Sequence, residues 1–398
     1  MPRIAPFPAI RYASGTDLQK VIAPPYDVLS AADVAGLAAL DEHNIVRIDV
    51  PSGDEDRYDG AARTLSDWLT EGVLVQDGAP SLTIYRMSFT DATGSARTIV
   101  GVLCGLEVVD AGAGGVLPHE RTTPKAVTDR LDLTRATAAN LSPVWGLSLA
   151  HGLTAALTEP GEPVGDVAFD GVVHTVERIS DPARIASIAQ ILAADDVLIA
   201  DGHHRYSISR TYRDEVRAAT GRDDTEAEFT LTFVNELVAD QLSIEAIHRV
   251  YTGPTIDQLR ADLAGSFDLE PAPVPTPALL ADMVRLGRLV LLAPDGSAEW
   301  LIPRDGAFNG VRALDGAYLE HALAGSAAEV TYQHGLDEVL DVVGSGQVTA
   351  GVLIRPTSLE EIQRTAREGL LMPPKSTFFT PKLRTGLVIR PTARLPRA

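Results

Sequence analysis

The sequence predicts an α+β fold with mixed sheets. Two apolar, β-branched segments at 81–90 and 96–109 flank the turn signal DATGS and should form an antiparallel hairpin. A helical pattern at 182–193, an apolar strand at 197–200 and a second helix at 203–219 follow one another directly. Antiparallel strand pairs and strand-to-helix connections in one chain are typical of α+β proteins.

Further elements are expected in the first third of the chain. The segment IAPPYDVL at 22–29 should be extended, because a residue before proline avoids the helical region. Ser30 is placed to cap a helix, and a second helix is expected at 58–72. NIVRIDVP at 44–51 is strand-like, and a proline in a first-turn position favours a polar-faced helix at 124–140.

Length and breaker residues predict two domains. A chain of 398 residues is long enough for two or three domains. The stretch 151–167 mixes proline, glycine and acidic residues, so we expect an N-terminal α+β domain at 1–165 and a second α+β domain at 166–398. The proline-rich segment EPAPVPTPA marks a small insert near 252–310 within the second domain.

Charge and cysteine content restrict the partners. The 34 basic and 54 acidic residues give a net charge of −20, which disfavours nucleic acid and anionic membranes as partners. The single cysteine, Cys104, lies in an apolar stretch, so a disulfide within the chain is excluded. No apolar run is long enough to span a bilayer, and we expect a soluble cytoplasmic enzyme.

The strongest functional signal is Asp201-Gly202-His203-His204-Arg205. A strand that ends here, followed at once by a helix, presents free backbone N–H groups and the positive end of a helix dipole. Gly202 allows close backbone approach, and the next three side chains add hydrogen-bond donors. Arg205 in a first helical turn is unfavourable against the dipole unless an anion compensates, so the turn is predicted to hold phosphate.

Two alternatives to phosphate binding remain open for this turn. Asp201 could cap the helix while His203 and His204 bond to neighbouring backbone. Paired imidazoles could also bind a metal ion, although adjacent helical positions point about 100° apart and no second ligand cluster is evident.

A second group of ionisable residues lies between 119 and 130. His119 and Glu120 follow a glycine-rich loop, where catalytic groups are often displayed, and either could accept a proton from a substrate hydroxyl. Lys125 and Arg130 are candidates for binding substrate. Lys125 and Asp129 are also four residues apart, which would suit an ordinary surface ion pair.

A third group is basic and lies near the C-terminus. Lys375, Lys382 and Arg384 fall within ten residues of an acidic chain, so an anion such as phosphate is their expected partner. A solvated basic edge is the alternative. Asp27 in PPYD and Asn235 at a strand end are further candidates for binding substrate.

Several segments together resemble the family known as domain of unknown function 1015, over essentially the whole chain. They are IAPPYDV, NIVRIDVP, HERTTPKAVTDRLDL, NLSP, IADGHHRY, the pair His248-Arg249, and KSTFFTPKLRTGLV. The family label carries no agreed activity.

The DGHHR turn is also similar to the phosphate-binding turns of sulfiredoxins, ParB nucleotide-binding domains and ParB-like free-serine kinases. This resemblance implies a ParB/sulfiredoxin-like strand–turn–helix site, with Gly202, His203, His204 and Arg205 on phosphate and Asp201 near Mg²⁺ or the nucleophile. Sulfiredoxin chemistry is not expected, since His203 replaces the cysteine of that turn.

The sequence therefore predicts a small-molecule kinase that acts on a hydroxyl such as that of free serine. The expected donor is ATP, ADP or pyrophosphate with Mg²⁺, and Glu120, Asp201 or His119 is the expected base. A ParB-type nucleotide-binding regulator and a phosphatase or other hydrolase are the alternatives. A homodimer is considered as an assembly.

Overall fold

The computed structural model describes residues 1–53, 56–91, 94–118, 127–373 and 375–393. The chain forms two compact units. The first unit comprises residues 1–242 together with the C-terminal segment from 381, and the second comprises 243–380. The second unit therefore interrupts the first in the sequence. The boundary expected near residue 165 falls instead inside a strand of the first unit, β9 (Glu162–Phe169).

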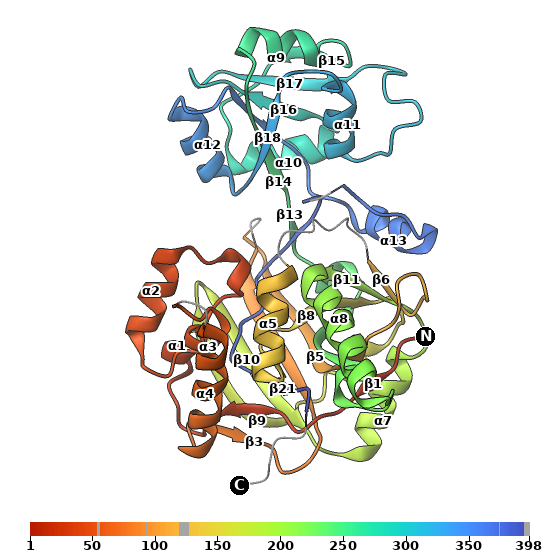
Figure 1. Ribbon diagram of the computed structural model, residues 1–398. Coiled ribbons are helices and arrows are strands. Elements are labelled where there is room, and N and C mark those ends of the chain that lie inside the picture. The colour runs from red at the N-terminus through yellow and green to blue at the C-terminus, as the bar shows by residue number, and fades with distance from the viewer. Residues whose placement is uncertain (54–55, 92–93, 119–126, 374, 394–398) are drawn as a thin grey trace. The chain divides into compact units, whose positions relative to one another are not determined.

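The first unit contains both helices and strands along its whole length (Figure 1). Its first elements are β1 (Ile4–Ala5), β2 (Ile10–Tyr12), α1 (Leu18–Val21), η1 (Tyr26–Val28), α2 (Ala31–Leu40), α3 (Val46–Asp49), α4 (Arg57–Thr70), β3 (Leu74–Gln76), β4 (Leu82–Thr90), β5 (Ala96–Glu107), β6 (Val116–Pro118), α5 (Val127–Thr137) and β7 (Ala139–Asn140). The remaining elements are β8 (Val144–Ser148), α6 (Leu153–Ala156), β9, β10 (Val172–Ile179), α7 (Pro182–Leu192), β11 (Val197–Asp201), α8 (His203–Thr220), η3 (Glu226–Glu228), β12 (Phe229–Glu236), η4 (Ala239–Gln241) and β21 (Arg390–Pro391).

A large mixed sheet forms the centre of the first unit, which confirms the predicted fold class. Its strands lie in the order β6-β11-β8-β12-β5-β4-β10-β9, and β1 also pairs with β5. β11 is parallel to β6 and antiparallel to β8, while β12 is parallel to β8 and antiparallel to β5. The predicted hairpin is confirmed as the antiparallel pair β4 and β5.

Three helices have the caps that the sequence predicted. Ser30 caps α2 in a capping box with Asp33, and Asp181 caps α7, with a proline following at the first helical position. Gly221 ends α8 in the left-handed conformation, with φ +67°. In Figure 1, α5 and α8 lie side by side over the sheet.

The core of the first unit packs sheet residues against α6 and α7. Its buried side chains include Leu82 and Ile84 of β4, Val102 and Leu106 of β5, Leu153 of α6, and Ile188 and Leu192 of α7. Burying a large aliphatic side chain contributes about 1.5–3 kcal/mol. This core therefore fixes the strand β11, whose Val197 and Ile199 belong to it.

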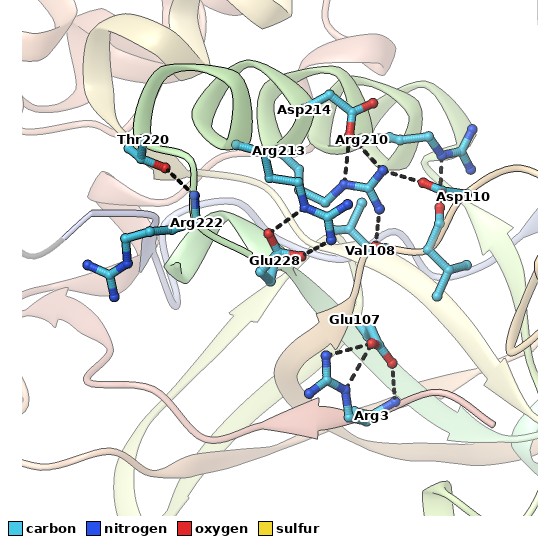
Figure 2. Close-up of polar contacts among 12 residues, drawn as sticks. Arg3, Glu107, Val108, Asp110, Arg210, Arg213, Asp214, Thr220, Arg222 and Glu228 are labelled. Atoms are coloured by element: carbon cyan, nitrogen blue, oxygen red, sulfur yellow. Dashed lines mark hydrogen bonds and ion pairs between the residues drawn. The ribbon is translucent and has the colours of Figure 1, made fainter. Parts of the chain in front are cut away.

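Helix α8 is tied to the end of β5 by arginines (Figure 2). The buried guanidinium of Arg213 donates to the carbonyl of Val108 and to the carboxylates of Asp110 and Asp214. Arg210 donates to the next carbonyl along the same segment. These contacts attach the middle of α8 to the segment that follows β5.

The C-terminal segment returns through the first unit. The backbone of Thr385 exchanges hydrogen bonds with that of Ala23, and the backbone of Ile389 does so with that of Ile10. The buried Arg390 then bonds to the carbonyls of Phe229 and Glu226. Lys382, just before this segment's first bridge, is thereby held in the first unit and bonds to Asp201 at the end of β11.

The prediction of a strand at 44–51 is wrong, because part of this segment forms helix α3. The side chain of Asn44 accepts a hydrogen bond from the backbone N–H of Val46 at 3.0 Å and starts a helical turn. A short apolar run fits a buried strand and a buried helical turn equally well, so periodicity could not separate them. This local hydrogen bond between the Asn44 side chain and the backbone favours the turn over an extended strand.

The second unit is a separate α+β body. Its elements are β13 (Ile244–Glu245), β14 (Ile247–Thr252), α9 (Ile256–Leu263), β15 (Phe267–Pro271), α10 (Pro277–Leu286), β16 (Leu289–Leu292), β17 (Ala298–Pro303), α11 (Asp315–Ala322), β18 (Glu329–His334), α12 (Leu336–Gly344), β19 (Ala350–Leu353), α13 (Leu359–Glu368) and β20 (Phe378–Phe379). The sheet order is β15-β17-β16-β19-β14-β18. The insert expected near 252–310 is part of this larger unit.

Within the described ranges, no helix combines the length and the apolar character needed to cross a bilayer.

His174 is a buried titratable group of the first unit. Its ring Nδ1 lies 2.8 Å from the hydroxyl of Tyr85, and Arg384 Nε donates to its Nε2 at 3.4 Å. Burial and the charge of Arg384 lower the pKa of His174 to about 3. The folded protein therefore keeps this ring neutral where an unfolded chain, with a pKa of about 6.5, binds a proton.

Stability should consequently fall as the pH is lowered from about 6.5 towards 3. His174→Gln should weaken this dependence by up to about 2–3 kcal/mol between pH 6.5 and 4.5, since each pH unit is worth about 1.4 kcal/mol per proton. Urea unfolding at the two pH values measures the difference. His248 contributes in the same direction, as burial lowers its pKa to about 4. Equal pH dependence in variant and wild type would contradict the assignment.

Candidate functional site

The candidate site is built around the turn between β11 and α8. Gly202 is the N-cap residue of α8 and has φ +84°, a left-handed conformation that suits glycine. A Cβ at this position would lie 2.9 Å from Nε of Arg205. The glycine therefore serves both the turn and the close approach of the guanidinium. No side chain caps the start of α8, which leaves the helix end suited to an anion.

Asp201 lies between two cations. Its Oδ2 accepts a hydrogen bond from Lys382 Nζ at 2.9 Å, and its Oδ1 accepts one from the Gly202 N–H at 2.6 Å and lies 3.6 Å from Arg205 Nη2. Burial disfavours the charged form, but Lys382 and Arg205 outweigh this effect and hold the pKa of Asp201 well below its ordinary range. Asp201 is thus a fixed carboxylate that joins the C-terminal segment to the turn.

Arg205 is the central cation of the site. Its side chain is 10% exposed, and Nη1 donates to the carbonyl of Pro143. Its Nη2 also lies 4.0 Å from Asp27 Oδ2, at the outer limit of an ion pair. Its Nε is buried and has no hydrogen-bond partner among the described residues. Burial opposes the charge of Arg205, but Asp27 and Asp201 raise its pKa, so the guanidinium stays charged.

A second carboxylate–arginine pair lies beside Arg205. The buried Asp49 accepts from Arg130 Nη1 at 3.2 Å and from the hydroxyl of Ser142 at 3.2 Å. The Arg130 guanidinium also lies 4.2 Å from the centre of the Tyr26 ring. Burial raises the pKa of Asp49, against the opposing charge of Arg130. These groups and Arg205 line a cavity of about 50 Å³, large enough for a small polar group.

The structure brings together many of the residues that the sequence singled out. Asp201, Gly202, Arg205 and Lys382 form one hydrogen-bonded and ion-paired group, and Asp27 adjoins it. Arg130 lines the same cavity as Arg205. His203 and His204 are half-buried in the first turn of α8.

Other expected site residues lie elsewhere. Arg384 is buried against His174, Tyr85 and Asp170, with its guanidinium 4.2 Å from the centre of the Phe169 ring.

Asn235 lies in the core, where it accepts from Trp145 Nε1 at 2.7 Å and donates to the Gln241 carbonyl at 2.8 Å. Its side chain thus serves packing, since both of its polar ends are used. Lys375 belongs to the second unit. His119, Glu120 and Lys125 lie outside the described residues.

Asp201 does not suit the metal-ligand role that we expected. Its Oδ2 accepts from Lys382 and its Oδ1 from Gly202, with Arg205 3.6 Å away, and a metal ion beside these two cations would meet strong repulsion. The described ranges contain no group of three His, Cys, Asp or Glu residues that could hold a metal ion. The same contacts make Asp201 a poor general base, because a carboxylate with a lowered pKa releases rather than accepts a proton.

Tyr26, Asp49 and Ser142 also line the cavity, although their sequence patterns gave little sign of it. The sequence places Asp49 in a strand, whereas it ends α3 and reaches the cavity from the N-terminal part of the unit. Ser142 bonds to both Asp49 and Thr385, and so connects three distant segments. The only sequence signal for them was their presence in the segments PPYD, RIDVP and NLSP.

A double-mutant cycle should measure the half-buried Asp201–Lys382 pair. Lys382→Met leaves the carboxylate of Asp201 with one cation fewer and should lower the free energy of unfolding by about 1–3 kcal/mol. Asp201→Asn should partly restore stability in the double variant, with a coupling energy above about 1 kcal/mol by urea unfolding.

The exposed pair Arg222–Asp224 is the matched control. Its two atoms are 2.7 Å apart, but the side chains are 63% and 70% exposed. Solvent screening should make its coupling energy clearly smaller than that of the Asp201–Lys382 pair. Equal coupling in the two pairs would mean that the Asp201–Lys382 pair is no more than a surface contact.

Solved structures similar to this chain at low sequence identity include the following three, and no curated protein matches the sequence. A conserved hypothetical protein from Pyrococcus furiosus is 10% identical, with a TM-score of 0.36 over 67% of this chain and 87% of that chain. Free serine kinase in complex with AMP is 11% identical, with a TM-score of 0.36 over 67% and 84%. SbnI with a C-terminal truncation from Staphylococcus aureus is 13% identical, with a TM-score of 0.35 over 68% and 81%.

These similarities carry no information on activity. The family model described as "Protein of unknown function (DUF1015)" matches residues 4–317. This range covers most of the 398 residues, so the protein belongs to the DUF1015 family.

Proposed function

We propose that the protein transfers a phosphoryl group from a nucleotide or pyrophosphate donor to the hydroxyl of a small molecule such as free serine. The observation that carries the proposal is the buried, charged Arg205 at the uncapped start of α8. Phosphoryl transfer needs positive groups that neutralise the transferred charge, together with a group that accepts a proton from the nucleophile. The site offers both kinds of group.

Arg205 and the helix start are the proposed donor site. A planar guanidinium can give two parallel hydrogen bonds to a phosphate, and the backbone at a helix start gives more. Asp201 and Lys382 support this arrangement by fixing the turn on which Arg205 is mounted. The Nε of Arg205 is buried and lacks a hydrogen-bond partner among the described residues. A ligand that shifts the Arg205 side chain could therefore accept a hydrogen bond from this atom.

Asp27 is the proposed proton acceptor. Three carboxylates lie near Arg205, those of Asp27, Asp49 and Asp201. Asp201 accepts a hydrogen bond from Lys382, and the buried Asp49 is paired with Arg130. Asp27 is 41% exposed, and its ion-pair contact among the described residues is a 4.0 Å approach to Arg205. A substrate hydroxyl could therefore reach Asp27 next to the phosphate group. His119 and Glu120, which the sequence also favoured, lie outside the described residues and stay candidates.

The proposed reaction is tested by incubation with ATP, ADP or pyrophosphate and a panel of hydroxylated metabolites, including serine, in buffer with Mg²⁺. Phosphorus NMR should show a new phosphomonoester only when donor and acceptor are both present. Gly202→Ala should weaken donor binding at least about tenfold, because the new methyl group displaces Arg205 and a charge-assisted hydrogen bond is worth about 1.5–3 kcal/mol.

Gly221→Ala is the control, since it has φ +67° on the same helix and its Cβ would meet nothing within 4 Å. Consumption of donor without an acceptor would favour a hydrolase. Tight nucleotide binding without turnover would favour a regulatory protein. Equal donor affinity in the two glycine variants would overturn the donor site.

Asp27→Asn should lower kcat by about 10²–10⁴ while donor affinity changes little. The amide keeps the size of the side chain but cannot accept the proton. Steady-state rates and donor titration of the same preparation separate the two effects. The matched control is Asp224→Asn on the exposed surface, which should keep the wild-type rate. A wild-type kcat in Asp27→Asn would eliminate Asp27 as the base.

A further inference from the structure

The cavity beside Arg205 lies between helices α5 and α8, which lie side by side over the sheet (Figure 1). The residues that line it from these two helices are Arg130, Leu133 and Thr134 of α5 and Arg205, Ile208 and Ser209 of α8. Its volume of about 50 Å³ leaves room for a group of a few heavy atoms. The proposed donor site uses Arg205 from the α8 side, whereas the α5 side has no part in it.

Arg130 is held in the α5 side of the wall with one donor nitrogen unused. Its Nη1 donates to the backbone carbonyl and to the carboxylate of Asp49, and its Nε donates to Asp129. The guanidinium also lies 4.2 Å from the centre of the Tyr26 ring. Among the described residues, Nη2 has no hydrogen-bond partner. A guanidinium fixed in this way can offer Nη2 to a planar acceptor and keep its other contacts.

Two further groups in the wall have unused hydrogen-bond capacity. The Oδ1 of Asn140 accepts from the backbone N–H of Leu231 and from Arg390. Because both of these partners are donors, they fix the orientation of the amide, and Nδ2 donates to no described residue. The hydroxyl of Tyr26, which also lines the cavity, likewise has no hydrogen bond within the described ranges. A wall of this kind favours a ligand that accepts hydrogen bonds.

The acceptors in the wall already have donors. The carboxylate of Asp49 accepts from Arg130 and from the hydroxyl of Ser142. The hydroxyl of Ser209 donates to the backbone carbonyl of Arg205. A ligand group that only donates, such as an ammonium, therefore finds fewer partners here than a carboxylate does.

The rest of the wall is apolar. Leu133, Leu141 and Ile208 line the cavity together with the polar groups. They accommodate a short hydrocarbon segment attached to the polar group of a ligand, but they offer nothing to further hydroxyls. The size and the lining thus suit a compound of few carbons that carries one carboxylate.

We infer that the acceptor of the proposed phosphoryl transfer is a small hydroxy acid, whose carboxylate is bound in this cavity by Arg130 and Asn140. This inference rests on the proposed function, which puts the phosphate at Arg205 and the proton acceptor at Asp27. Arg205 lines the cavity and lies 4.0 Å from Asp27, so a short acceptor bound through its carboxylate can reach Asp27 with its hydroxyl. A compound without the carboxylate leaves the donors of the wall unpaired and is rejected.

Calorimetric titration of the full chain with matched acids and amides, without any donor, tests the inference. Serine is compared with serinamide, and glycerate with glyceramide, since each amide keeps the hydroxyl and loses the negative charge. The acids should bind at least about tenfold more tightly than their amides. Equal affinity of acid and amide overturns the inference. A Kd for serine that rises in proportion to added inorganic phosphate would assign the cavity to phosphate and overturns it as well.

Arg130→Lys keeps a cation beside the buried Asp49 but removes the planar fork. It should reduce the preference for acid over amide at least about tenfold, whereas a purely structural role would weaken both ligands equally. Arg135→Lys is the matched control on the same helix, because that side chain is 45% exposed and pairs with Asp132 and Glu215. It should keep the wild-type preference. Equal preferences in the two lysine variants overturn the inference.

Asn140→Asp supplies a second variant in case Arg130→Lys does not fold. It keeps the oxygen that accepts from Leu231 and replaces the donor with a negative charge, so the Kd of the acids should rise and that of the amides should change little. An unchanged preference in this variant overturns the role of Asn140.

The transfer assay separates this inference from the proposed function. Selective binding of the acids without any phosphomonoester supports the carboxylate site and contradicts phosphoryl transfer. Phosphorylation of the amides as fast as of the acids supports phosphoryl transfer and overturns the carboxylate site.

Discussion

The hydrogen-bonded ion pair between Asp201 and Lys382 is the interaction on which the site of the first unit depends. It joins the end of β11 to a segment that lies 181 residues further along the chain. Because both groups are largely withdrawn from water, losing either partner leaves a charge that solvent cannot stabilise well. The pair therefore fixes the backbone turn at Gly202, and this turn determines the position of Arg205.

Arg205 faces an electrostatic conflict that its surroundings only partly relieve. A cation in the first turn of a helix is opposed by the dipole, and burial opposes it further. Asp201 and Asp27 compensate, but neither forms a hydrogen bond with the guanidinium, as their separations of 3.6 Å and 4.0 Å show. Conflicts of this kind are concentrated at functional sites, because an anion can relieve them.

The three carboxylates near Arg205 are all aspartates, so the differences in their pKa and exposure come from their surroundings. Lys382 keeps Asp201 ionised, whereas enclosure raises the pKa of Asp49. Asp27 is the member of this group that solvent reaches most easily. In a chain with a net charge of −20, the three cations of this site, Arg130, Arg205 and Lys382, are each at most 19% exposed and lie beside carboxylates.

The sequence by itself determined the α+β class, the hairpin of β4 and β5, the caps of α2 and α7, and the strand–turn–helix at Gly202. These features follow from local periodicity and capping, which act over a few residues. Only the tertiary structure decided that Lys382 pairs with Asp201. It also placed Asp49 and Ser142 at the same cavity as Arg205. Arg384 and Asn235, by contrast, are buried among core residues. Those outcomes depend on how distant segments return to one another, and neither the charge of a side chain nor its neighbours in sequence contain that information.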